Sequence, residues 1–113
     1  MTQTLSPIDL QAWDKALNGP NPDYQKLYEE MLDANKKSSA DNVAILWRLA
    51  KVTYMVSLNT LDLKEIKEKT QEGLNYAQKV VNIDSNNFQG NLWLANTAGK
   101  LALIEESLEP KLK

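Results

Sequence analysis

Few residues of this chain could carry out acid–base, nucleophilic or metal chemistry. Its 113 residues include neither His nor Cys, so there is no imidazole base, no thiol nucleophile and no ordinary zinc site. The remaining candidates are Glu105, Glu106 and Glu109, carboxylates that in principle can act as acid and base or hold a divalent ion. Nothing in the sequence around them indicates an enclosing pocket, which favours a solvated edge. We therefore expect a protein that is not an enzyme, with no cofactor and no bound metal.

Charge is distributed unevenly along the chain. There are 13 Lys and Arg against 15 Asp and Glu, a net charge of −2. Residues 1–41 contain seven acidic residues and four Lys, whereas residues 42–113 contain nine basic and eight acidic residues. The overall balance argues against general nucleic-acid binding, which needs a basic face. No secretory signal is visible, and the longest apolar run, residues 43–47, is far short of the about 20 residues that cross a bilayer. We expect a soluble, cytoplasmic protein.

The pattern of apolar residues, capping residues and breaks along the chain predicts consecutive helices. Capping residues, Gly19-Pro20 and short polar breaks predict helices over about 7–18, 22–34, 41–58 and 63–83, and another from residue 88. Gly99 is expected to divide the last helix, and Pro110 to stop it. No stretch alternates like a strand, so the fold class is all-α, with five or six antiparallel helices. The third helix carries two apolar sets, which predicts that it packs on both sides or lines a groove.

The third and fourth helices have the spacing of a tetratricopeptide (TPR) repeat. Small residues on its second helix let the first approach closely, and large side chains fill the gaps. Lys51 departs from this pattern because it replaces the usual Gly, and 18 residues separate Tyr54 from Gly73, more than in the repeat consensus. We predict one TPR-like domain over 1–113, with an N-terminal helical pair (1–41), a repeat (42–87) and the start of a second repeat (88–113). The matching positions are Trp47, Ala50, Tyr54, Gly73, Ala77, Val80 and Ser85.

Three segments in order resemble the regulator of microtubule dynamics family. They are ILWRLAK at 45–51, EGLNYA at 72–77, and NNF at 86–88 with Trp93 five residues later. The resemblance runs from about residue 24 to 99. It implies a divergent TPR-like adaptor linked to microtubules, spindle function or chromosome segregation. In some members it implies mitochondria or membrane contact sites, so a lipid-binding or organelle-tethering module is the alternative. The chain is then a domain fragment or a divergent short member.

Arrays of TPR repeats bind partners along the face made by the first helix of each repeat. The corresponding positions predict a partner-binding groove, unless the first two helices or further C-terminal helices cover it. A single Arg in it can hold a carboxylate or a carbonyl, and the apolar positions can accept a helix or an extended peptide. The groove residues are Ile45, Arg48, Val52, Met55, Leu92 and Asn96.

Two further surfaces are candidates for contact. Lys64, Lys67 and Lys69 can contact an acidic surface such as tubulin tails or anionic lipid, although a solvated face with helix ion pairs is favoured. An incomplete solenoid is also expected to expose the apolar side of its last helix, because terminal repeats need a polar cap. We therefore predict self-association through Leu101, Leu103, Ile104 and Leu108.

Overall fold

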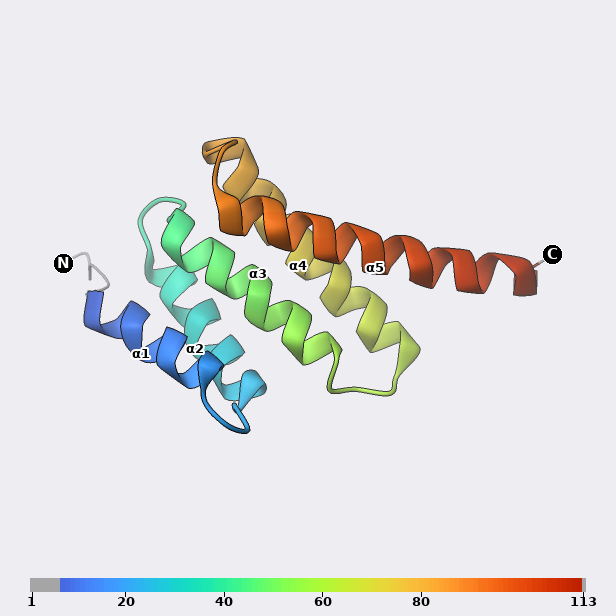
Figure 1. Ribbon diagram of the computed structural model, residues 1–113, viewed down its shortest axis with the longest axis horizontal. Helices are drawn as coiled ribbons and strands as arrows, with labels where there is room; N and C mark the ends of the chain where they lie inside the picture. Colours follow the sequence, from blue (N-terminus) through green and yellow to red (C-terminus); the bar gives the residue numbers. More distant parts are fainter. Residues whose placement is uncertain (1–6, 113) are drawn as a thin grey trace.

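The computed structural model describes residues 7–112, with side chains described for residues 10–106. Over this range the chain forms five helices and no strand, as the all-α prediction requires. They are α1 (Pro7–Asn18), α2 (Tyr24–Lys37), α3 (Val43–Ser57), α4 (Leu63–Ile83) and α5 (Phe88–Leu112). Helix α3 lies at the centre and contacts all four others, and α5 continues past the body of the molecule at its C-terminal end (Figure 1).

Side-chain caps fix where three of the helices begin. The Asp23 carboxylate accepts a hydrogen bond from the Lys26 amide at 3.1 Å, which caps α2. Asn42 caps α3 by accepting from the Ala44 amide at 2.9 Å, and Asp62 caps α4 in the same way. Each cap satisfies an amide that has no partner within its own helix, so the polar breaks in the sequence define the helix starts.

Two sequence-based expectations about α5 are wrong. Gly99 does not divide it, and the helix runs without a break from Phe88 to Leu112. A Gly inside a helix costs only about 1 kcal/mol relative to Ala, which does not end a helix packed along much of its length. Pro110 also lies within α5; it removes one helical amide donor, but only two residues of the helix follow it.

Helix α3 packs on neighbours at both of its apolar faces. Ile45, Leu49, Val52 and Val56 are buried in one core cluster with side chains from α1 and α2. The opposite face meets α4 and α5 around Gly73, where an added Cβ would lie 3.4 Å from the Ala50 carbonyl and 3.3 Å from Thr97. The first of the two sequence-based alternatives, packing on both sides, is therefore confirmed.

Helix α2 is joined to α4 by a hydrogen-bonded network. The Tyr28 hydroxyl donates to the Glu72 carboxylate at 2.5 Å and accepts from the Lys69 ammonium at 2.8 Å. Lys69 also pairs with Glu72 at 3.2 Å, and the Tyr76 hydroxyl donates to the same carboxylate at 3.2 Å. The two hydrogen bonds that join α2 to α4, Tyr28–Lys69 and Tyr28–Glu72, connect residues 41 and 44 positions apart in the sequence.

The network makes stability depend on pH in the alkaline range. Burial, followed by Glu72, raises the pKa of Tyr28 and of Tyr76 above the ordinary 10.0. Burial alone lowers the pKa of Lys69, but hydrogen bonds to Tyr28 and Glu72 outweigh it and raise that pKa above 10.5. All three groups hold protons more tightly in the folded chain than in the unfolded one. Their contribution to stability is therefore complete below pH 10.0 and is lost as the pH rises through the folded pKa values.

We expect the double variant Tyr28→Phe/Tyr76→Phe to lose less stability than the wild type as the pH rises above 10.0. Removing both hydroxyls removes two of the groups that release protons on unfolding, while Lys100, whose pKa burial lowers, acts in the opposite direction in both proteins. Urea unfolding at a series of pH values measures this slope. Tyr24→Phe, outside the network, serves as the control. Equal slopes for the double variant and the wild type would contradict the expectation.

Candidate functional site

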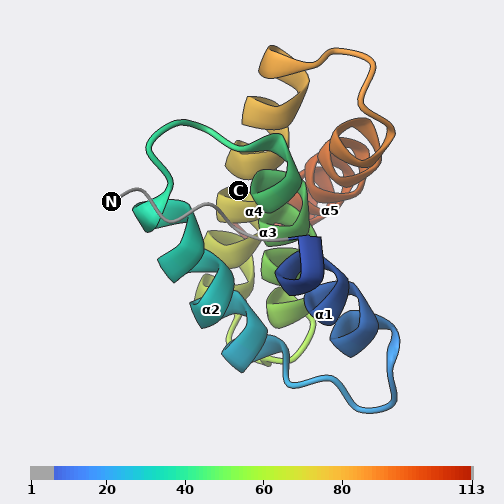
Figure 2. The same cartoon turned by 90° about the vertical axis from the view of Figure 1, so that its left-hand side faces the viewer.

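One side of α3 is half-exposed and lies between α1 and α5. Trp47, Arg48, Lys51 and Tyr54 follow one another at helical spacing and are only partly buried. Arg48 contacts α1, whereas Lys51 and Tyr54 contact α5. Figure 2 shows α1 and α5 on the right of the molecule and α2 on the left. Contacts to α1 and α5 therefore define one face of the protein.

Cations and aromatic rings alternate over this face. Arg48 lies 4.2 Å from the centre of the Trp47 ring, and the Lys100 ammonium lies 5.0 Å from the Tyr54 ring. The Tyr54 and Trp93 ring centres are 5.6 Å apart at 50°, and the Lys51 ammonium lies 6.0 Å from Trp93. Such pairs are attractive because the ring face carries partial negative charge. We call this surface the cation–aromatic face; it consists of Trp47, Arg48, Lys51, Tyr54, Trp93 and Lys100.

Lys51 and Lys100 carry charge that no described acidic side chain balances. Among the described side chains, neither ammonium group lies within ion-pair distance of a carboxylate. Lys100 donates a hydrogen bond to the Ser57 hydroxyl at 2.8 Å, and its partial burial lowers its pKa below the ordinary 10.5. A partly desolvated cation with only neutral partners gains stability from an anion, because an opposite charge restores the lost solvation.

Arg48 is already bound within the protein. Its Nε donates to Asp14 Oδ1 at 2.8 Å and its Nη2 to Asp14 Oδ2 at 2.7 Å, a bidentate pair between α3 and α1. A third nitrogen, Nη1, donates to the Ala44 carbonyl at 3.0 Å. Arg48 therefore positions α1, and a partner carboxylate would have to displace Asp14 to reach it.

The residues predicted for the partner-binding groove differ in their exposure. Ile45 and Val52 are 2% and 0% exposed, because α1 and α2 cover the side of α3 on which they lie. The prediction that Ile45 and Val52 lie on an open surface is therefore wrong. Met55 is half-buried, while Leu92 and Asn96 on α5 are exposed.

Sequence reasoning assigned Trp47 and Tyr54 to the core and did not place Lys51 or Lys100 on a binding surface. Lys51 is the feature of the sequence that could have revealed the cation–aromatic face. A long cation stands where the repeat pattern usually has Gly, one turn before Tyr54.

The three Lys of α4 differ in their surroundings. Lys64 and Lys67 are exposed, and no ion pair holds either among the described residues. Lys69 is engaged by Tyr28 and Glu72, as described above. Of the three Lys predicted to contact an acidic surface, Lys64 and Lys67 are therefore accessible.

The residues predicted for self-association are also dissimilar. Leu103 is 65% exposed, Leu101 is half-buried and Ile104 is buried at 9% exposure. The side chain of Leu108 lies outside the described residues, as does that of Glu109. Glu105 and Glu106 are exposed on α5. Self-association stays a prediction.

The described part of the chain contains neither a metal site nor a membrane-spanning helix. No group of acidic side chains there is placed to hold a metal ion. None of the described helices combines the length and apolar character needed to cross a bilayer.

The fold and the site define a class of protein: an all-α domain of packed helices whose most distinctive surface combines cations with aromatic rings. The chain belongs to the regulator of microtubule dynamics protein 1-3 family, whose model matches residues 9–113. The match includes most of α1 and all of α2, α3, α4 and α5, more of the chain than the segments that carry the resemblance in the sequence. No curated protein and no solved structure matches this chain.

Proposed function

We propose that this chain is a non-enzymatic interaction scaffold that associates with microtubules, and that the cation–aromatic face receives an acidic segment of its partner. The observation that carries the proposal is the pair of partly buried side chains of Lys51 and Lys100, whose ammonium groups lack a carboxylate partner among the described side chains. The family is named for the regulation of microtubule dynamics, which supports a cytoskeletal or spindle location. On this proposal, α3 and α4 form the TPR-like repeat and α5 begins the next.

An acidic peptide suits this face for two reasons. Its carboxylates can form charge-assisted hydrogen bonds with Lys51 and Lys100, which are about twice as strong as neutral ones. Its backbone and apolar atoms can pack on the Tyr54 and Trp93 rings, which offer large rigid surfaces at little entropic cost. Acidic tubulin tails have this chemistry.

Co-sedimentation with stabilised microtubules tests the proposal. We expect Lys51→Gln/Lys100→Gln to weaken binding about tenfold, because each lost charge-assisted bond contributes about 1.5–3 kcal/mol before solvent screening. Gln at position 100 can still donate to the Ser57 hydroxyl, so the fold is expected to persist. The matched control is Lys64→Gln/Lys67→Gln, which removes the same charge from exposed positions on α4.

Two outcomes would overturn the assignment. Loss of binding in the Lys64/Lys67 variant alone would place the contact on α4. Flotation with anionic liposomes, without microtubule binding, would replace the scaffold with the lipid-binding alternative. Repeating both assays at two salt concentrations shows whether the contact is electrostatic.

A further inference from the structure

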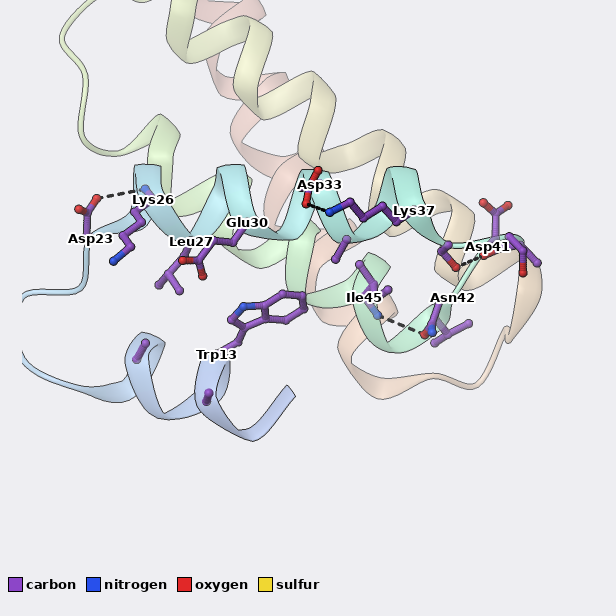
Figure 3. A pocket seen from close by; sticks show the side chains of 17 residues that line it. Trp13, Asp23, Lys26, Leu27, Glu30, Asp33, Lys37, Asp41, Asn42 and Ile45 are labelled. Atoms are coloured by element: carbon purple, nitrogen blue, oxygen red, sulfur yellow. Dashed lines mark hydrogen bonds and ion pairs between the residues drawn. The ribbon is translucent and has the colours of Figure 1, made fainter. Parts of the chain in front are cut away.

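A second surface lies between α1 and α2, away from the residues of the cation–aromatic face. It is an open groove of about 1470 Å³, closed at one end by the loop that joins α2 to α3. Pockets for small molecules usually enclose about 300–1,000 Å³, so the size of this groove favours a segment of polypeptide. Figure 3 shows Trp13 extending from α1 into the groove, with Leu27 and Glu30 reaching toward it from α2.

The floor of the groove is apolar, and its α1 wall is built from small side chains. Trp13, Leu27 and Ile45 form the floor, where they are nearly buried in the core cluster. Ala12 and Ala16 are exposed along α1, one helical turn apart. Side chains of this size leave room for the backbone of another helix to approach closely, while α1 and α2 make few contacts with each other.

The rim of the groove is acidic. Four carboxylates and two Lys line it: Asp23, Glu30, Asp33, Asp41, Lys26 and Lys37. Asp33 and Lys37 pair with each other at 2.9 Å, and Asp23 is occupied in part by capping α2. Among the described residues, no cation pairs with Glu30 or Asp41. The groove therefore presents negative charge beside an apolar floor.

We propose that this groove docks a basic amphipathic helix of a protein partner. Apolar residues on one side of that helix would meet Trp13 and the Ala walls, and Lys or Arg at its edges would meet Glu30 and Asp41. The charge required is opposite to that of the acidic segment assigned to the cation–aromatic face. The proposal does not depend on that assignment, and the two sites allow this chain to join two different partners.

Fluorescence anisotropy with a designed peptide tests the groove. The probe is a labelled helix of about four turns with Leu on one side and Lys on the other. We expect Glu30→Lys/Asp41→Lys to weaken its binding about tenfold, since two complementary rim charges are reversed. The matched control, Glu29→Lys/Glu68→Lys, changes the charge equally at exposed positions outside the groove. Circular dichroism confirms that each variant is helical.

Shape is tested separately from charge. Ala16→Trp fills the wall of the groove and is expected to weaken binding about tenfold as well, whereas Ala98→Trp, exposed on α5, serves as its control. Equal losses in both charge variants would reduce the binding to general attraction between opposite charges and overturn the proposal. Unchanged binding in Ala16→Trp, or equal affinity for a peptide with Glu in place of Lys, would also overturn it.

Discussion

Gly90→Leu is expected to lower the free energy of unfolding by about 3 kcal/mol, at the upper end of the usual cost of overpacking. A Cβ added at Gly90 would lie 2.5 Å from Val80 Cγ1 and 3.1 Å from Val80 Cβ. Val80 is fully buried, and its branched side chain has few alternative rotamers. The added side chain can be accommodated only if α4 and α5 separate where they now pack most closely.

Gly99→Ala, on the same helix, is expected to have the opposite effect. No atom lies within 4 Å of a Cβ added there, so the variant gains the better helix propensity of Ala without a clash. We expect the free energy of unfolding to rise by about 0.5–1 kcal/mol. Urea unfolding followed by circular dichroism measures both changes. If Gly90→Leu does not fold, Gly90→Ala provides a milder form of the same test, and wild-type stability in both would contradict the packing of α4 on α5.

Arg48→Met is expected to loosen α1 from the rest of the protein by about 2 kcal/mol. The variant keeps a side chain that can pack on Trp47, but loses the two hydrogen bonds to Asp14 and the one to the Ala44 carbonyl. Charged hydrogen bonds contribute about 1.5–3 kcal/mol, and the partial exposure of Asp14 reduces that contribution. Because α1 has few other contacts with α3, the loss falls mainly on this helix.

Hydrogen exchange of the α1 amides measures the effect. A loss of about 2 kcal/mol corresponds to exchange roughly 30-fold faster in α1, with smaller changes in α3 and α4. Arg48→Lys keeps the charge but not the planar fork, so we expect an intermediate rate. Combining each variant with Asp14→Asn isolates the pair in a double-mutant cycle. Unchanged exchange in Arg48→Met would show that α1 is held by its apolar contacts alone.

The helices could be predicted from the sequence largely because their starts are encoded locally. Asp23, Asn42 and Asp62 each supply the side-chain oxygen that begins a helix, and Gly19-Pro20 ends the first. The end of α5 was harder to predict. Gly99 and Pro110 disfavour a helix locally, but the packing of α5 along α4 outweighs the cost of one Gly, and only two helical residues follow Pro110.

The site was less predictable because α3 is apolar on two sides. The sequence contains no signal that tells which side neighbouring helices cover, so Ile45 and Val52 were assigned to the open surface when they are in the core. Asp14 and Arg48 are 34 residues apart, and their pairing depends on how α1 folds back. The groove between α1 and α2 also arises from tertiary packing, since its acidic residues come from α2, its N-cap and the following loop, and its Ala wall from α1.

The central position of α3 also has a kinetic consequence. Its most extensive contacts are with α2 and α4, the helices that precede and follow it, and α4 packs in turn on α5. Chains whose contacts join neighbouring segments close short loops and cross low entropic barriers, so such helical domains fold in microseconds to milliseconds. We expect the α3–α4 hairpin to form first, and α1, held through Asp14 and a few apolar side chains, to dock last.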